Sequence, residues 1–154
     1  MRWVTLAAAL AAALAATPAT AGVLDRARET GELRVGYRPD AQPFSFKDAQ
    51  GVARGYSVDL CRAVATEAAA AVTRPDLRVV EVEVSAQDRL DALTEGRVDL
   101  LCEATSVTLE RRERMDFSLP TFATGATLLY PAGGATNFQE LAGKKVGVLA
   151  GSTI

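Results

Sequence analysis

The stretch that decides the fold is LRVVEVEVSAQDRLDALTEGRVDLLC, residues 77–102. Its first part, Leu77–Val84, alternates apolar and polar side chains, which predicts a strand with one solvent-exposed face. Ser85 then caps a helix expected over Gln87–Glu95 that ends at a glycine. Val98–Cys102 is a short, nearly continuous apolar run, as in a buried parallel strand. Strand, helix and strand in this order predict a βαβ unit.

Elements of the same kind precede this unit. Val23–Thr30 has the pattern of a short amphipathic helix ended by Gly31, and Leu33–Tyr37 that of a strand. A longer, alanine-rich helix is expected from Ser57, as its N-cap, to about Ala71. The apolar face of this helix is formed by Val58, Cys61, Ala65 and Ala68. The alternation of strands and helices predicts an α/β fold with a parallel sheet.

The pattern becomes looser after residue 103. A brief charged helix is expected after Thr108, which would cap it, and an extended segment follows it as far as Pro120. Two further strands are expected, at Ala126–Tyr130 and Lys144–Leu149. Gly151–Ile154 then has the pattern of a turn from a strand into a helix.

Composition and charge exclude several functional classes. The 154 residues are 49% hydrophobic and 23% charged, which is typical of a globular domain and not of a disordered chain. A net charge of -2 argues against nucleic-acid binding through bulk positive charge. Because the sequence has no histidine, Ser-His-Asp catalysis, Cys-His catalysis and His-ligated metals are excluded within these 154 residues. Two cysteines are too few for a four-cysteine zinc site, so we expect neither a metal nor a cofactor.

The first 21 residues are typical of a secretory signal peptide. Arg2 supplies a positive start, Val4–Ala16 is uncharged and apolar, and Ala19-Thr20-Ala21 has the small-x-small pattern that precedes cleavage. A transmembrane anchor is the alternative, but the run is shorter than the ~20 residues needed to span a bilayer. We expect cleavage before Gly22 and a mature chain in the periplasm, without a transmembrane segment.

Export bears on Cys61 and Cys102, the two cysteines of the sequence. An oxidising compartment permits a disulfide between them. Cys61 lies in the long helix and Cys102 ends a strand, and a helix packed on a sheet can bring such positions face to face. The alternative is that both are free, buried, small apolar residues. We expect the disulfide.

A series of short motifs runs through the mature chain. They are Gly36-Tyr37-Arg38, Pro43-Phe44-Ser45-Phe46, Gly55–Leu60, Arg97–Leu100, Thr105–Arg111, Asp116–Pro120, Leu141–Val148 and Gly151-Ser152-Thr153. In order and spacing they resemble the bacterial extracellular solute-binding proteins of family 3, the amino-acid receptors of ABC importers. The resemblance covers Leu33–Thr153.

The resemblance implies a two-lobed clamp of the type II periplasmic-binding-protein class, in which two α/β lobes close on a ligand. Residues 22–122 would form the first lobe, without the later segment that returns to complete it in the family. Residues 123–125 would cross the hinge, and residues 126–154 would begin the second lobe. Because family members are much longer, we expect this sequence to be an N-terminal fragment that alone binds ligand poorly.

The resemblance also implies how an amino acid would be held. Arg111 matches the arginine that grips the α-carboxylate, a role that suits the planar fork of guanidinium donors. Further matches are Ala104, Thr105 and Ser106 in a cleft-facing loop, Ser152 and Thr153 as donors of the second lobe, and Tyr56 as an aromatic packed on the ligand. The alternative for each is an ordinary role in a turn, a cap, the core or a solvated surface.

Two more arginines bear on the side chain of the ligand. Arg38 and Arg89 match positions that receptors for glutamate and aspartate use or carry, and a second buried carboxylate needs a second cation. Ala86 and Ala104 depart from the hydroxyls of those receptors. Glu103 could repel a side-chain carboxylate, or it could pair with Arg38 and neutralise it. An acidic amino acid is favoured, with polar neutral amino acids as the alternative.

The function that the motifs and the family resemblance predict is binding, not catalysis. A monomeric receptor would deliver a small-molecule amino acid to the membrane subunits of an ABC importer. One alternative is the ligand-binding domain of a channel or sensor kinase. Another is an enzyme similar to cyclohexadienyl dehydratase, for which Glu103 is the nearby candidate general acid.

Overall fold

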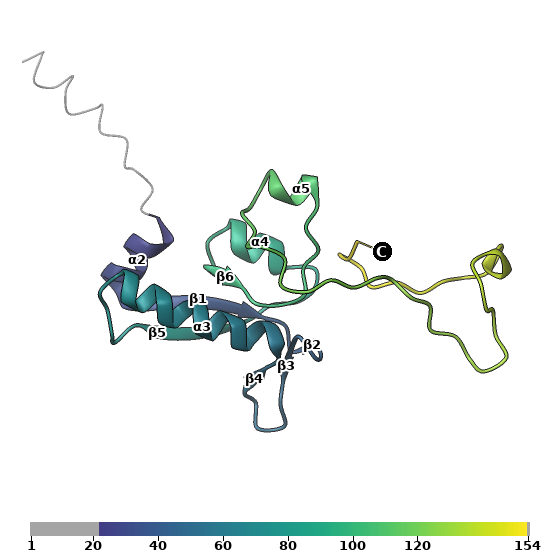
Figure 1. The fold of residues 1–154 in the computed structure, drawn as a ribbon, viewed down its shortest axis with the longest axis horizontal. Coiled ribbons are helices and arrows are strands. Elements are labelled where there is room, and N and C mark those ends of the chain that lie inside the picture. The colour runs from purple at the N-terminus through teal and green to yellow at the C-terminus, as the bar shows by residue number, and fades with distance from the viewer. Residues whose placement is uncertain (1–21, 154) are drawn as a thin grey trace, which may run out of the picture.

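A three-stranded parallel sheet, in the order β5–β1–β6, forms the centre of the molecule (Figure 1). The computed structural model describes residues 22–153, so the predicted signal peptide lies outside the described residues. The strands are β1 (Glu32–Tyr37), β5 (Arg78–Glu83) and β6 (Leu100–Leu101). β1 is central and pairs in parallel with both neighbours. The βαβ prediction for residues 77–102 is therefore confirmed.

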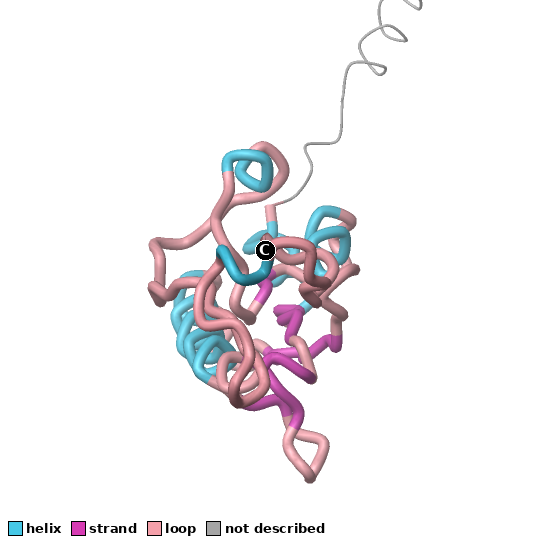
Figure 2. Tube along the Cα trace, turned by 90° about the vertical axis from the view of Figure 1, so that its right-hand side faces the viewer, coloured by secondary structure: helices cyan, strands magenta, loops and turns pink. Residues whose placement is uncertain are grey.

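Four α-helices are found among the described residues, close to their predicted positions. They are α2 (Val23–Thr30), α3 (Tyr56–Ala71), α4 (Arg89–Thr94) and α5 (Leu109–Arg112). α3 lies along one side of the strands (Figure 2), where Cys61 and Ala65 pack against Leu33 and Val35 of β1. Ala92 of α4 belongs to a separate apolar cluster that includes Val82 of β5. Because side chains alternate along a strand, the two clusters lie on opposite faces of the sheet.

α3 begins differently from the prediction. Ser57 was expected as its N-cap, but the helix starts at Tyr56 and its N-cap residue is Gly55. The free N–H groups of Tyr56 and Ser57 instead donate to the backbone carbonyls of Pro43 and Phe44 (3.1 and 2.9 Å). A Cβ at Gly55 would lie 2.4 Å from the Phe44 oxygen, and its φ is 124°. Only glycine fits this close approach of backbone to backbone.

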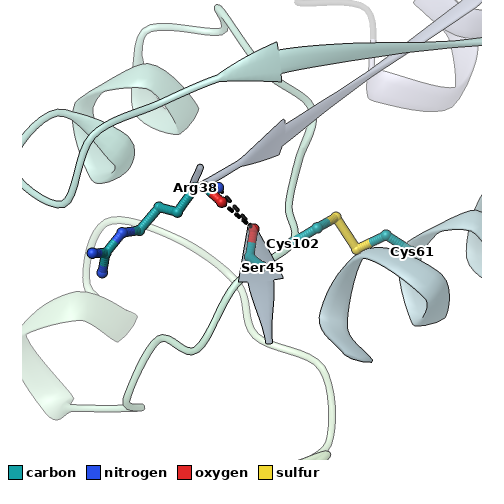
Figure 3. Close-up of a disulfide and its surroundings, with 4 residues drawn as sticks. All are labelled: Arg38, Ser45, Cys61 and Cys102. Carbon is teal, nitrogen blue, oxygen red and sulfur yellow. Dashed lines mark hydrogen bonds between the residues drawn. A yellow bond between two sulfur atoms is a disulfide. The ribbon is translucent and has the colours of Figure 1, made fainter. Parts of the chain in front are cut away.

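A small antiparallel sheet follows β1. It consists of β2 (Asp40–Ala41), β3 (Ser45–Lys47) and β4 (Ala53–Arg54), with a cis peptide bond at Gln42–Pro43. The buried Ser45 hydroxyl donates to the carbonyl of Arg38 (2.9 Å) and accepts from its N–H (2.8 Å), as Figure 3 shows. These two bonds fix the backbone of Arg38 directly after β1.

A disulfide joins Cys61 of α3 to Cys102, the residue after β6 (Figure 3). The two Cα atoms are 6.0 Å apart, within the usual range for bridged cysteines. The predicted pairing is therefore found in the structure. The bridge attaches the helix to the start of the loop 103–106.

The predicted strands at Ala126–Tyr130 and Lys144–Leu149 are wrong. In the described residues 123–153 the regular element is a short 3-10 helix, Gln139–Leu141. An isolated strand needs a neighbour to satisfy its backbone, and neither segment is paired. Leu129, Val146 and Val148 are accordingly exposed. This part of the chain runs away from the sheet and returns, so that residues 150–153 lie near α4 and α5 (Figure 1).

Asp99 links three segments at the amino-terminal end of β6. Its side chain is 2% exposed and pairs with Arg26 and Arg34. It also accepts a bond from the Arg34 N–H (2.7 Å). Burial raises the pKa of Asp99, but the hydrogen bonds from Arg34 and Arg26 outweigh burial and hold that pKa below its usual value.

Because the pKa of Asp99 is lower in the folded state, its stabilisation is present above the unfolded pKa of about 3.9. It is lost as the pH falls through the lower, folded value. We expect Asp99→Asn to lower the free energy of unfolding by about 1.5–3 kcal/mol at neutral pH. The variant should also lose less stability on acidification than the wild type, as measured by urea denaturation. Asp25→Asn, at an exposed pair with Arg28, is the matched control and should change stability by less than about 1 kcal/mol. An unchanged acid dependence in Asp99→Asn would contradict this role.

Candidate functional site

The candidate site lies at the carboxyl ends of the parallel strands, the edge where open α/β sheets bind ligands. Arg38 directly follows β1 and Glu103 lies two residues after β6. Arg89 is the first residue of α4, and Arg111 belongs to α5. The topology of the sheet therefore gathers three predicted arginines and Glu103 from four segments.

Glu103 lies between two of these arginines. Its Oε1 accepts from Arg89 Nε (2.8 Å), and its Oε2 lies 3.8 Å from Arg38 Nη1. The side chains of Glu103, Arg89 and Arg38 are 0%, 5% and 9% exposed. Arg38 also pairs with the exposed Asp40 (3.0 Å). Glu103 thus forms an ion pair with Arg38, as one prediction had it, and its hydrogen-bonded partner is Arg89.

Burial raises the pKa of Glu103 more than the charges of Arg89, Arg38 and Arg111 lower it. The net pKa of this carboxyl therefore lies above its usual value. Its Oε2 has no hydrogen-bond partner among the described residues. Thr105 Oγ1 is a second buried polar atom without such a partner. Two unsatisfied groups in one loop are unusual, since buried polar atoms are nearly always bonded.

Arg111 connects the loop to the end of the described chain. Thr108 caps α5, as predicted, by accepting from the Arg111 N–H (3.2 Å). Arg111 Nη1 donates to the carbonyl of Ser106 (2.9 Å), and Nη2 to that of Gly151 (3.4 Å). Arg89 Nη2 donates to the same Gly151 carbonyl (3.1 Å). Both arginines therefore contact the returning segment.

The remaining predicted residues fall into two groups. Thr153 donates to the Ser106 hydroxyl (3.2 Å), and the half-buried Ser152 is its neighbour. Tyr56 lies elsewhere: its hydroxyl donates to the Thr121 carbonyl (2.8 Å), and its ring packs edge-on against Phe44 and Phe122.

A groove of about 1310 Å³ connects the two regions. Its lining includes Phe44, Phe122 and residues of α3 as well as Glu103, Ala104, Thr105 and Ser106. The loop 103–106 and the rings of Phe44 and Phe122 therefore line one concave surface.

Two contacts were missed at the sequence level. Asp40 was not among the predicted residues, although its spacing of two residues from Arg38 could have suggested a pair. Gly151 was part of a motif, but it contacts the arginines through its backbone carbonyl. A contact of this kind cannot be predicted from the pattern of side chains.

Residues 33–145 match the model of the bacterial extracellular solute-binding proteins, family 3. The chain belongs to this family. It is 36% identical to the glutamate/aspartate import solute-binding protein of Salmonella typhimurium, over 96% of this chain and 49% of that protein. It is also 30% identical to a cyclohexadienyl dehydratase of Pseudomonas aeruginosa, over 77% of this chain and 41% of that protein.

A solved structure supports the same fold. An ancestral amino acid-binding protein, described as a precursor of cyclohexadienyl dehydratase, has a TM-score of 0.55 and 35% identity. The alignment covers 63% of this chain and 40% of that one. The predicted type II periplasmic-binding-protein fold class is confirmed.

The chain spans about half the length of the curated relatives it matches. Across residues 22–153, none of the helices has both the length and the apolar character needed to cross a bilayer.

Proposed function

We propose that the full-length protein binds a free amino acid outside the cytoplasm and delivers it to the membrane subunits of an ABC importer. The observation that carries the proposal is the convergence of Arg38, Arg89 and Arg111 at one edge of the sheet. A relative that is 36% identical over the aligned region is a glutamate/aspartate import solute-binding protein, which supports an acidic amino acid as the favoured ligand.

The α-carboxylate of the ligand would bind Arg111. Arg111 is partly exposed, and its guanidinium already faces two carbonyl groups, those of Ser106 and Gly151. A planar fork in this position suits a bidentate carboxylate. The hydroxyls of Thr105, Ser106 and Thr153, with Ser152 and the backbone of Ala104, would complete the polar contacts. Tyr56 would act with Phe44 and Phe122 as an apolar wall.

Arg38 and Arg89 would contact the side chain of the ligand and determine which side chains are accepted. Both are buried and close to Glu103, so that a second carboxylate entering this region would meet two guanidinium groups. A buried charge without a partner is costly, and this favours anionic over cationic side chains.

Localisation follows from the family and the first 21 residues. The family is extracellular by description, and the sequence predicts export with signal-peptide cleavage before Gly22. We propose a monomeric periplasmic receptor. We further propose that residues 22–122 belong to its first lobe, residues 123–125 to the hinge and residues 126–154 to the second lobe.

Signal-peptide cleavage can be tested by N-terminal sequencing of the periplasmic protein. The sequence should begin at Gly22, and a product that retains Met1 would contradict cleavage.

A catalytic function is the second candidate, and one observation favours it. Glu103 is a buried carboxyl with a raised pKa, as a general acid requires, and a relative is a cyclohexadienyl dehydratase. Turnover of a cyclohexadienyl substrate by the purified protein, lost in Glu103→Gln, would favour the enzyme over the receptor.

Isothermal titration of the full-length protein with a panel of amino acids tests the receptor function. We expect Arg38→Ala to weaken glutamate and aspartate binding at least ~10-fold more than glutamine or serine binding, because only the acids lose a charge partner. Arg112→Ala is the matched control, since Arg112 is exposed in the same region. A preference of the wild type for lysine or arginine would contradict the acidic assignment.

A further inference from the structure

Glu103 presents an unsatisfied oxygen to the candidate site. Its Oε1 is held by Arg89 Nε, whereas Oε2 is fully buried and lacks a hydrogen-bond partner among residues 22–153. The residue lies in the loop that lines the groove. Ionised, this oxygen can only accept a hydrogen bond; protonated, it can donate one.

The arginines around Glu103 are already partly occupied. Arg89 donates to Glu103 and to the Gly151 carbonyl. Arg38 Nε donates to Asp40 Oδ1 (3.0 Å), and Nη2 lies 3.0 Å from the same oxygen, which leaves Nη1 facing Glu103 Oε2. The charged groups that face Glu103 are therefore Arg38 after β1, Arg89 of α4 and, farther away, Arg111 of α5, with Asp40 behind Arg38. Three positive and two negative charges leave a net charge of +1 before a ligand binds.

The α-carboxylate and α-ammonium groups of a free amino acid cancel in charge, so the charge of the ligand side chain beside Glu103 decides the fit. When Glu103 is ionised, an acidic ligand would bring a second carboxylate beside it, and two carboxylates in one buried site share a proton. An amide side chain has no such conflict, because its NH₂ group can donate directly to Oε2.

We propose that Glu103 selects the ligand side chain through its protonation state. As a carboxylate it accepts from the NH₂ of glutamine or asparagine. As a carboxylic acid, with a proton taken from solvent, it donates to the side-chain carboxylate of glutamate or aspartate. This inference rests on the proposed amino-acid binding, and it assigns to one residue the discrimination between acid and amide ligands.

Glu103→Gln separates the two states. Arg89 Nε holds the position of Oε1 and so fixes the carbonyl oxygen of the new amide there, which places its NH₂ at the position of Oε2. The variant therefore imitates the protonated form permanently. It should keep or strengthen glutamate binding and should weaken glutamine binding, because the ligand NH₂ group loses its charged acceptor and the ligand amide must turn over to accept from the new NH₂ group.

Isothermal titration in two buffers with different ionisation enthalpies measures the proton uptake. With wild-type protein at a pH above the pKa of Glu103 in the free protein, glutamate binding should take up close to one proton and glutamine binding close to none. Glutamate affinity should also fall about 10-fold per pH unit above the pKa of Glu103 in the free protein, while glutamine affinity stays level. Glu103→Gln should abolish the proton uptake and shift the glutamate-to-glutamine affinity ratio at least ~10-fold toward glutamate. Glu110→Gln, at an exposed position of α5, is the matched control.

Several results would overturn the proposal. Equal proton uptake for both ligands in the wild type would do so, even if the Glu103 variant failed to fold. Proton uptake retained in Glu103→Gln, or equal weakening of both ligands by it, would do so as well. Absence of any amino-acid binding by the wild type would overturn the proposed function itself, a result distinct from binding without ligand-dependent proton uptake.

Discussion

Arg111→Ala should abolish binding of every amino acid by the full-length protein. All free amino acids carry the α-carboxylate that we assign to this residue, so the loss should not depend on the side chain of the ligand. Truncating one partner of a buried, hydrogen-bonded charge pair costs about 2–5 kcal/mol, which corresponds to a ~30- to 5000-fold weaker affinity. Titration calorimetry with glutamate, aspartate, glutamine and serine measures the effect.

Two further variants distinguish binding from a purely structural role. Arg111→Lys should recover only part of the affinity, because an ammonium group cannot reproduce the bidentate fork. Arg112→Ala, the exposed neighbour, should leave binding unchanged. Arg111 also donates to the carbonyls of Ser106 and Gly151, so thermal unfolding should be measured in parallel. Wild-type affinity in a folded Arg111→Ala protein would refute the assignment.

The first part of the fold could be predicted because local pattern and packing agree there. Leu77–Val84 alternates and has a neighbour, β1, so that its register is fixed by pairing as well as by pattern. Lys144–Leu149 also has the composition of a strand, but no described segment pairs with it, and it remains irregular. A strand pattern in the sequence is sufficient only where a partner strand exists.

The candidate site could be predicted as a set of residues but not as a set of contacts. The motifs predicted that Arg38, Arg89 and Arg111 lie close together, and the structure places them at one edge of the sheet. The choice of Arg89 over Arg38 as the hydrogen-bonded partner of Glu103 depends on where α4 begins, at Arg89 itself. The predicted start of α3 was wrong for a similar reason. Backbone carbonyls of Pro43 and Phe44, and not a side chain, accept hydrogen bonds from the N–H groups at its N-terminus. Backbone groups carry no sequence signal.

Removal of the disulfide should have the largest effect on stability. Cys61 and Cys102 are 41 residues apart. In the chain-entropy model a bridge that closes a loop of this length stabilises the folded state by about 4 kcal/mol. Cys61→Ala/Cys102→Ala should lower the melting temperature of the exported protein accordingly, and a reducing agent should lower that of the wild type but not that of the double variant.

The same disulfide should also affect ligand binding, because Cys102 lies next to the loop of the candidate site. Cys102 immediately precedes Glu103 and the loop 103–106, which contains the unsatisfied Glu103 and Thr105 oxygens. Since the disulfide attaches this loop to α3, its removal should weaken amino-acid binding even at temperatures where the double variant is folded, because the loop must then be ordered by the ligand. Thiol titration of the unfolded, unreduced protein provides the control and should find no free thiol. Two thiols per chain would show that the bridge does not form, and unchanged affinity in the folded double variant would show that the loop is held by its arginine contacts alone.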